Sequence, residues 1–306
     1  MAGEEQVVEV EGRRLVLRNL DKVLYPATGT TKGEVLHYVA AVAGAMLPHL
    51  RDRPLTRMCW PDGVQGPMFV EKNLPQGTPS WVRRVRLPVP GSGADRETID
   101  YPIADDLPTL VWTANLAALE LHVPQWTVGP RGGVHGPNRL VIDLDPGPPA
   151  GLAECAEVAC AVRARLADDG LQALPVTSGS KGMQLYAAIS GRQDADAARE
   201  YARVLAEELE RAMPRLVVSR MTKSLRPGKV LLDWSQNNAA KTTIAPYSLR
   251  GREMPWVAAP RRWDEVDGGG SRLSQLGFEQ VLARLQRDGE LLEPLLRSGP
   301  RLPERG

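Results

Sequence analysis

Two aspartates stand two residues apart at the end of an apolar stretch, Asp143 and Asp145 in Leu140-Val-Ile-Asp-Leu-Asp. This stretch is typical of a buried β-strand, in which alternate side chains point to one face, so we expect the two carboxylates to lie close together. Two ionised carboxylates that close repel each other, and their burial without a partner costs free energy. A divalent cation removes that conflict, because Mg²⁺ and Mn²⁺ prefer oxygen ligands.

A third aspartate follows another short apolar run. Asp233 comes after Val230-Leu-Leu and before Trp234-Ser-Gln, so a neighbouring strand could bring it to the same ions. Three aspartates, two close in sequence and one distant, are the arrangement expected for two-metal nucleotidyl transfer. The alternatives are a solvated strand end for the paired aspartates and a simple turn former for Asp233. The apolar residues before each site favour the metal interpretation.

A tight polar turn with one cation, Thr177-Ser-Gly-Ser-Lys-Gly182, separates two apolar runs. Such turns expose successive N–H groups that can hold phosphate oxygens, which makes Ser178 and Lys181 candidate phosphate ligands. The alternative is an ordinary polar hairpin loop. Ser178-x-x-Lys181 also matches the S-x-x-K of penicillin-recognising hydrolases, but no S-D-N occurs and Lys241-Thr-Thr is not K-T-G. Arg250 lies in a basic, hydroxyl-rich stretch that could neutralise a triphosphate or a DNA backbone.

Near the N-terminus, Thr31-x-x-Glu34 is a capping box that opens a helix, and Lys32 lies in its first turn. A lysine there opposes the helix dipole. A phosphate bound at the helix N-terminus would explain it, with Asn19 and Lys22 from the preceding turn as further ligands. The alternative is a surface lysine that costs little. A separate candidate, His122, sits in an apolar stretch where a hydrogen-bonded core histidine is the commoner role.

The composition is that of an ordinary globular chain: 306 residues, 42% hydrophobic, 25% charged and a formal net charge of +1. This charge excludes a globally basic nucleic-acid binder, so any DNA-binding surface must come from local patches. The three cysteines show neither metal-ligand spacing nor a disulfide pattern. The acidic N-terminus lacks a signal sequence, and the most apolar run, Tyr38 to Leu47, is too short to span a bilayer. We therefore expect a cytoplasmic protein without a membrane partner.

Two regions differ in pattern. Residues 1–128 have mixed, Pro-rich signals that predict a short strand (14–17), a helix from Thr31 to about Leu50 and a second helix from about Pro108 to Leu121. Residues 129–306 are more regular and predict the order β-α-β-β-α-β, which is the split βαβ layout of an RNA-recognition (RRM-like) fold. The strands are expected at 139–145, 174–177, 183–189 and 216–219, the helices at 152–167 and 194–213, with a further strand at 229–234 and a short helix at 278–287.

Several motifs in this order resemble one family. They are Asp21-Lys-Val-Leu-Tyr-Pro, Leu140-Val-Ile-Asp-Leu-Asp-Pro-Gly, Val176-Thr-Ser-Gly-Ser-Lys-Gly and Asp233-Trp-Ser-Gln-Asn, extended by His122-Val-Pro-Gln-Trp and by 241–250. Together they are similar to the polymerase domain of bacterial ATP-dependent DNA ligase D, an archaeo-eukaryotic primase-superfamily module of non-homologous end joining. The match covers about residues 13 to 290. It implies an α+β primase-polymerase fold with an RRM-like catalytic core (129–306) and an N-terminal α/β module (1–128) packed on it, forming one compact domain.

The resemblance also implies roles for residues and partners. Asp143, Asp145 and Asp233 would bind two divalent metal ions, Mn²⁺ or Mg²⁺. The expected activity is template-directed addition of nucleotides, with NTPs preferred over dNTPs, to a primer 3′-hydroxyl at DNA gaps and broken ends. Ku and an ATP-dependent DNA ligase are expected partners, and DNA as substrate implies nucleoid association. The remaining implied residues are the nucleotide-binding set His122, Ser178, Lys181, Gln236, Arg250 and Phe69, and the 5′-phosphate-binding set Asn19, Lys22 and Lys32.

The chain departs from the family pattern at two places. Met58 and Cys59 stand where two basic residues often follow Thr-Arg, and Val70 replaces a second aromatic residue after Phe69. That aromatic commonly stacks on the incoming base, so its loss is expected to alter nucleotide affinity or sugar choice. These departures motivate two alternatives, a DNA-end binding and bridging module with weak catalysis, and a de novo primase. The chain is expected to be either a stand-alone polymerase, which Met1 favours, or an excised domain.

Overall fold

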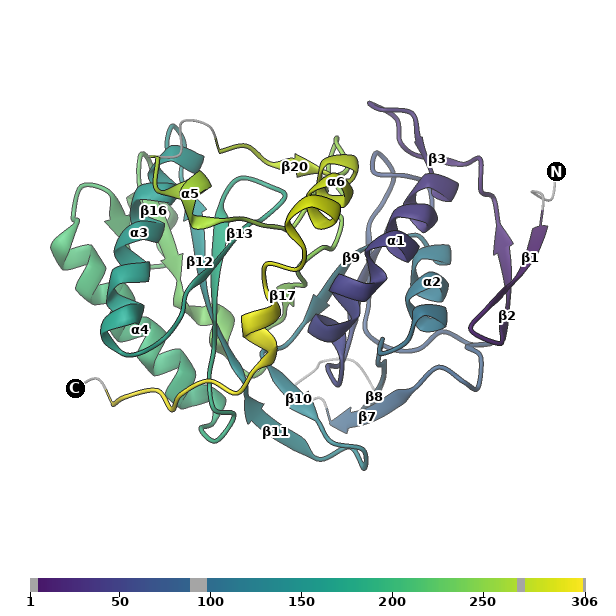
Figure 1. The fold of residues 1–306 in the computed structure, drawn as a ribbon, viewed down its shortest axis with the longest axis horizontal. Helices are drawn as coiled ribbons and strands as arrows, with labels where there is room; N and C mark the ends of the chain where they lie inside the picture. The colour runs from purple at the N-terminus through teal and green to yellow at the C-terminus, as the bar shows by residue number, and fades with distance from the viewer. Residues whose placement is uncertain (1–4, 89–97, 269–272, 305–306) are drawn as a thin grey trace.

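The computed structural model describes residues 5–88, 98–268 and 273–304. Figure 1 shows two sheet-and-helix halves side by side, with the yellow C-terminal segment running across both of them. Each half has its own hydrophobic core. No helix within the described residues is both long enough and apolar enough to cross a membrane.

The half that carries the paired aspartates is a six-stranded sheet with two long helices. Along the sheet the strand order is β15-β16-β12-β14-β13-β19. Leu140, Ile142 and Leu144 of the central strand pack against the helices in one core, so the alternate residues Asp143 and Asp145 point to the opposite face. The elements are β12 (Arg139–Pro146), α3 (Leu152–Asp168), β13 (Leu174–Thr177), β14 (Met183–Ala188), α4 (Ala195–Ala212), β15 (Val217–Val218), β16 (Val230–Asp233) and β19 (Ala259–Pro260).

Apart from β19, which was not predicted, these elements follow one another as predicted, with ends shifted by at most one residue. In the sheet, however, β16 lies between β15 and β12: it pairs antiparallel with β12 and parallel with β15. The strand that carries Asp233 therefore becomes the immediate neighbour of the strand that carries Asp143. The RRM-like description of this half stays a prediction.

The other half is built on a four-stranded sheet of order β17-β9-β5-β6. Helix α1 begins after Thr31, whose side chain accepts a hydrogen bond from the Glu34 amide and completes the predicted capping box. The main elements are α1 (Lys32–Leu50), β5 (Thr56–Cys59), β6 (Phe69–Glu71), α2 (Leu107–Asn115), β9 (Ala118–Val123) and β17 (Thr243–Ile244).

The predicted second helix is wrong in its C-terminal half. It ends at Asn115, and residues 118–123 form the strand β9 instead. Ala117 has a φ of 55°, a left-handed conformation that interrupts the helix. All six residues of β9 are buried, including the polar Glu120 and His122, which alternate with Leu119 and Leu121 as on a strand.

Smaller elements complete the chain. Five two-stranded sheets are formed by β1 (Glu5–Val10) with β2 (Arg13–Arg18), β3 (Val23–Tyr25) with β4 (Thr30–Thr31), β7 (Arg84–Pro88) with β8 (Thr98–Pro102), β10 (Trp126–Val128) with β11 (Val134–Pro137), and β18 (Trp256–Val257) with β20 (Leu276–Gly277). The helices α5 (Trp263–Val266) and α6 (Phe278–Asp288) and the 3-10 turns Lys223–Leu225, Trp234–Asn237 and Glu293–Leu296 lie among the later segments.

The later segments join the two halves. Strand β17 pairs with β9, and Tyr247 and Leu249 belong to the same core as α1. The buried Arg139 donates to Gln125 Oε1 over 2.8 Å, and Gln125 Nε2 donates to Thr243 Oγ1 over 2.9 Å. Backbone pairing and this buried polar chain fix the two sheets relative to each other, while a domain boundary at residue 128 stays a prediction.

Candidate active site

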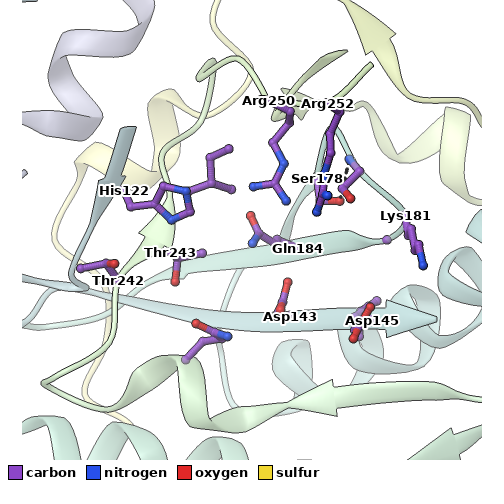
Figure 2. A pocket seen from close by; sticks show the side chains of 15 residues that line it. His122, Asp143, Asp145, Ser178, Lys181, Gln184, Thr242, Thr243, Arg250 and Arg252 are labelled. Carbon is purple, nitrogen blue, oxygen red and sulfur yellow. Dashed lines mark hydrogen bonds between the residues drawn. The ribbon is translucent and has the colours of Figure 1, made fainter. Parts of the chain in front are cut away.

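A cavity of about 360 Å³ lies between the two sheets. In Figure 2, Asp143 and Asp145 stand on one strand, while His122 and Arg250 approach from the other side of the cavity. Acidic groups therefore line one wall, and basic and hydroxyl groups line the wall opposite. The lining includes His122, Asp143, Asp145, Ser178, Lys181, Gln184, Gln236, Thr242, Arg250 and Arg252.

The strand register brings the carboxylates together. Asp143 is the cross-strand partner of Asp233 in the β12–β16 pair, and it faces Gln184 on the other side in the β12–β14 pair. Asp145 lies two residues along the same strand, on the same face. Of the three predicted metal ligands, Asp143 and Asp145 line the cavity, while Asp233 borders it through Gln236.

The Asp143 carboxyl is buried next to a second carboxylate. Burial and, to a smaller extent, the negative charge of Asp233 together raise the pKa of its carboxyl to about 7. A cation between these oxygens would relieve the repulsion, and the donor set consists only of carboxylate and amide oxygens, which suits Mg²⁺ or Mn²⁺. The residues present therefore fit a divalent ion.

The carboxylates are nevertheless turned toward protein partners. The exposed Asp145 side chain lies 3.5 Å from the guanidinium of Arg226, and Asp233 accepts from Gln236 Nε2 over 2.8 Å. Within the described residues, no three His, Cys, Asp or Glu side chains are close enough as they stand to hold a metal.

The turn between β13 and β14 forms one end of the cavity. Ser178 and Lys181, the predicted phosphate ligands, both line the cavity, and their role stays a prediction. A Cβ on Gly182 would lie 1.9 Å from the Leu144 carbonyl oxygen, so only glycine fits against β12 there. The side chain of Gln275 braces the turn: it accepts from the Gly179 amide over 2.7 Å and donates to the Gly182 carbonyl over 3.2 Å. Sequence reasoning missed Gln275, because nothing local marks it as a partner of the turn.

His122 and Arg250 meet at a carboxylate that sequence reasoning also missed. Glu120 Oε2 lies 2.8 Å from His122 Nε2 and accepts from the Arg250 guanidinium over 3.1 Å, while Oε1 accepts from the Gly251 amide over 3.0 Å. These contacts lower the pKa of Glu120 despite its burial. Its position two residues before His122 on a strand is the signal that could have revealed it.

Other residues divide into those inside and outside the cavity. Gln236 lines it, as predicted, and Arg252 is a further cation that the prediction omitted. Phe69 does not line it: this side chain is 47% exposed on β6 and borders a separate cavity of about 190 Å³, together with Arg57 and Cys59. A base-stacking role for Phe69 would therefore require a bound nucleic acid or nucleotide to extend to β6.

The predicted 5′-phosphate ligands cluster at the start of α1, away from this cavity. Lys32 is only 6% exposed and its Nζ donates to the Arg18 carbonyl over 2.7 Å, so the alternative of a solvated surface lysine is wrong. Burial lowers the pKa of Lys32 to about 8, with a further contribution from the charge of Lys22. Asn19 adopts a positive φ of 55°, and Lys22 pairs with Asp62 over 2.8 Å.

A basic segment adjoins the face that carries Asp143 and Asp145. Residues 211–232 contain no acidic residue, although the whole chain is nearly neutral. Arg226 of this segment reaches Asp145, and Lys223 lies on the exposed 3-10 turn next to it. The strand prediction for this segment used its apolar residues and did not consider its basic residues. The cations are Arg211, Arg215, Arg220, Lys223, Arg226 and Lys229.

Comparison with known proteins matches these features to one family. The family model described as LigD, primase-polymerase domain, covers residues 31–292. The multifunctional non-homologous end joining protein LigD of Mycobacterium bovis is 52% identical over 94% of this chain, and that of Mycolicibacterium smegmatis 50% over 94%. The chain spans 38% and 37% of the length of these two relatives. The bifunctional LigD of Bacillus subtilis is 32% identical over 90% of this chain and 43% of its own length.

Among solved structures, the polymerase domain from Mycobacterium tuberculosis ligase D in complex with DNA superposes with a TM-score of 0.87. It is 51% identical, and the match covers 94% of this chain and 99% of that one. The mixed helix and strand content expected from the resemblance is thus confirmed. On the strength of the family model and the extent of the match, the chain belongs to the LigD primase-polymerase domain family.

Proposed function

We propose that the protein is a DNA repair polymerase of non-homologous end joining, which adds nucleotides to a primer 3′-hydroxyl at gaps and broken ends under the direction of a template. The observation that carries this proposal is the cavity between the sheets, where a carboxylate face stands opposite Arg250, Arg252 and Lys181. A triphosphate needs that opposition, because its oxygens must contact cations while its reacting phosphorus stays near metal ligands. Membership of the LigD family supports the same activity.

The carboxylates would hold the metals. Asp143, Asp145 and Asp233 are the ligands for two divalent cations, Mn²⁺ or Mg²⁺, which when bound polarise the phosphate and favour loss of the primer hydroxyl proton. Gln184 and Gln236 orient the carboxylates, since Gln184 faces Asp143 and Gln236 donates to Asp233.

The opposite wall would bind the nucleotide. The Ser178 hydroxyl and Lys181 contact phosphate oxygens at the turn, and Arg250 contributes a guanidinium that is already held in place by Glu120. Arg250 Nε is buried without a hydrogen-bond partner, which leaves a donor for a ligand oxygen. His122 completes this wall near the sugar and phosphates, and Gln236 lines the cavity from the carboxylate side.

Two other surfaces would bind DNA. Asn19, Lys22 and Lys32 form the pocket for the 5′-phosphate of the downstream strand at the start of α1. The six cations of the 211–229 segment would contact the phosphate backbone next to Asp145. The solved relative is in complex with DNA, which supports a nucleic-acid substrate.

We infer the remaining properties from the family membership. These are a preference for NTPs over dNTPs, action together with Ku and an ATP-dependent ligase, nucleoid association, and an RRM-like core at 129–306 packed against an N-terminal module at 1–128. Phe69 would reach the incoming base only when the primer and template occupy the cavity beside β6. With Val70 next to it, this stacking surface is smaller than that of the two adjacent aromatic residues in the family pattern.

The test is extension of a primer across a short gap with a 5′-phosphate, supplied with Mn²⁺ and either NTPs or dNTPs. Template-directed addition that is lost in the Asp143→Ala/Asp145→Ala protein would support the polymerase. Tight binding to the same gap without addition would instead favour an end-binding module, and synthesis without any primer would favour a primase.

A further inference from the structure

Glu120 is buried beside the cavity but does not line it. Its side chain is 7% exposed, and its two oxygens accept from three donors: His122, Arg250 and the Gly251 amide. Two of those donors belong to residues that line the cavity wall opposite the aspartates. One carboxylate therefore joins a strand of the N-terminal half to the segment that follows β17.

Arg250 is held through its backbone and the base of its side chain as well as through its guanidinium. The carbonyl of Arg250 accepts from the hydroxyl of the buried Tyr25 over 2.9 Å, and its amide donates to the Trp256 carbonyl over 2.8 Å. A Cβ on Gly179 would lie 2.6 Å from Arg250 Cγ, so the side-chain stem lies directly against the phosphate-binding turn. The backbone and the base of the side chain are restrained in this way, and the contact with Glu120 restrains the guanidinium as well.

The same carboxylate fixes the ring of His122. A carboxylate can only accept, so His122 Nε2 must donate and carry a hydrogen. The ring atom left for any other partner is then Nδ1, which accepts a hydrogen bond when the ring is neutral and donates one when it is charged.

We propose that Glu120 is the positioning residue of the nucleotide site, which orients His122 through Nε2 and Arg250 through its guanidinium so that both meet the same triphosphate. This proposal rests on the proposed function and deepens it. Glu120 itself touches no ligand. Its effect on nucleotide binding passes through the two residues that it holds.

The first arm of the test needs no mutation. A ring N–H bonded to a buried carboxylate gives a low-field, slowly exchanging proton signal, and His122→Asn identifies the signal by its loss. We expect this signal in the wild-type protein without DNA or nucleotide. Its absence, or a ring hydrogen on Nδ1 of neutral His122, would overturn the proposal.

The second arm measures nucleotide binding directly. Glu120→Gln keeps the shape but removes the charge, and we expect the Kd for Mn²⁺-NTP to rise about 10- to 100-fold, as is typical when a supporting partner of a ligand-binding residue is lost. The Kd for gapped DNA should stay within about twofold. Glu290→Gln is the matched control, because Glu290 also accepts from a buried partner, Tyr247, and lies 3.9 Å from a histidine, His49, but is not among the cavity-lining residues. It should leave nucleotide affinity unchanged.

A double-mutant cycle separates positioning from general stability. If Glu120 acts through Arg250, then Glu120→Gln in an Arg250→Ala background should weaken nucleotide binding much less than it does in the wild-type background. Additive losses would overturn the proposal. If Glu120→Gln does not fold, Glu120→Asp replaces it in the same cycle with the same criterion.

These measurements remain distinct from the test of the polymerase. Primer extension by the wild type with equal nucleotide affinity in wild type and Glu120→Gln would leave the polymerase standing and remove the role of Glu120. Loss of nucleotide affinity in Glu120→Gln, in a wild type that binds nucleotide but does not extend primers, would support the role of Glu120 and remove the polymerase.

Discussion

The two candidate phosphate-binding regions of this molecule are built in opposite ways. The element at the start of α1 is local: Arg18, Asn19, Lys22 and Lys32 lie within one short stretch of chain, tied together by backbone and side-chain bonds. The cavity between the sheets draws on β9, β12, the β13–β14 turn and the segment after β17. The first site therefore depends on local conformation, and the second on the packing of the whole fold.

This difference predicts how each site fails. A local site should lose its ligand without affecting the other, while the cavity should respond to changes in residues that never touch a ligand. The expected experiments follow from the largest effect to the smallest.

Removing a carboxylate at the cavity should have the largest effect. We expect Asp143→Ala or Asp233→Ala to reduce nucleotide addition by at least about 10³-fold, because metal ligands contribute several kcal/mol to the transition state. Binding to a 5′-phosphorylated gap should persist, since it uses the distant α1 element. Single-turnover extension and DNA-binding titrations measure both, with Asp267→Ala, whose carboxylate pairs with Arg163 on the surface, as the control. Near-normal extension would show that these carboxylates do not hold the metals.

Adding metal should stabilise the cavity. Because a cation relieves the repulsion between Asp143 and Asp233, Mn²⁺ at about 100 times its Kd should stabilise the wild type by about 2.7 kcal/mol and raise its Tm. A chelator should reverse the shift. Asp143→Asn should remove most of it, and the Lys22→Ala/Lys32→Ala protein should retain it. An equal shift in Asp143→Asn would place the metal elsewhere.

Loss of the α1 lysines should have a smaller and more selective effect. We expect Lys22→Ala with Lys32→Ala to reduce the preference for a 5′-phosphorylated gap by about tenfold. Each charge-assisted contact contributes about 1.5–3 kcal/mol at best. The net effect is smaller, because Lys22 loses its bond to Asp62 when it binds a phosphate. Nucleotide affinity in the cavity should not change. The matched control is Lys229→Ala, a lysine of the basic segment. An unchanged ratio between phosphorylated and unphosphorylated gaps would contradict the pocket.

The same preference should depend on pH. Lys32, with a pKa of about 8, is mostly charged below that value and mostly neutral above it, whereas a phosphate monoester loses its second proton with a pKa of about 6. The preference for a 5′-phosphate should therefore be greatest between these values and fall several-fold as the pH rises past 8. Bound phosphate will itself raise the pKa of Lys32, which moves the fall to higher pH. Measurements on Lys32→Arg, which stays charged, should show no such fall.

Restoring the second aromatic should have the smallest effect. Val70 is 52% exposed on β6 beside Phe69, so Val70→Phe fits without repacking the core. One added stacking contact contributes about 1 kcal/mol at the lower end of its range, which corresponds to a several-fold lower nucleotide KM. Val7→Phe, at an equally exposed site on the N-terminal hairpin, is the control. An unchanged KM would show that β6 does not reach the incoming base.

The sequence predicted the local features best. The capping box at Thr31, the helices α3 and α4, and the strand carrying Asp143 all depend on short-range patterns, and the structure has them where expected. The helix through 118–121 was wrong because that prediction followed the helical spacing of the apolar residues, although Glu120 and His122 alternate with Leu119 and Leu121 as they do on a strand. Position in the sheet could not be predicted either: nothing in the residues around Asp233 shows that its strand would lie between β15 and β12.

The residues of the candidate site divide in the same way, into those that local patterns predict and those that depend on the fold. Ser178, Lys181 and the paired aspartates were predicted because each motif lies on one turn or strand. Glu120 and Gln275 were missed, because each acts on a residue that is distant along the chain and reaches it only through the fold. The resemblance predicted that Phe69 binds the nucleotide, but in this structure Phe69 borders a separate cavity.

The pairing of β17 with β9 also affects how the chain folds during its synthesis. The Leu121 amide of β9 donates to the side chain of Ser248, which lies 127 positions further along the chain. The four-stranded sheet therefore cannot be completed until the later half of the chain has been synthesised and β17 can pair with β9. Contacts of such long range slow folding, because the entropy of closing the intervening loop is lost before the contact forms. On the ribosome, the nascent N-terminal half would emerge with an open edge at β9. Its protection from aggregation would then depend on how quickly the rest of the chain follows.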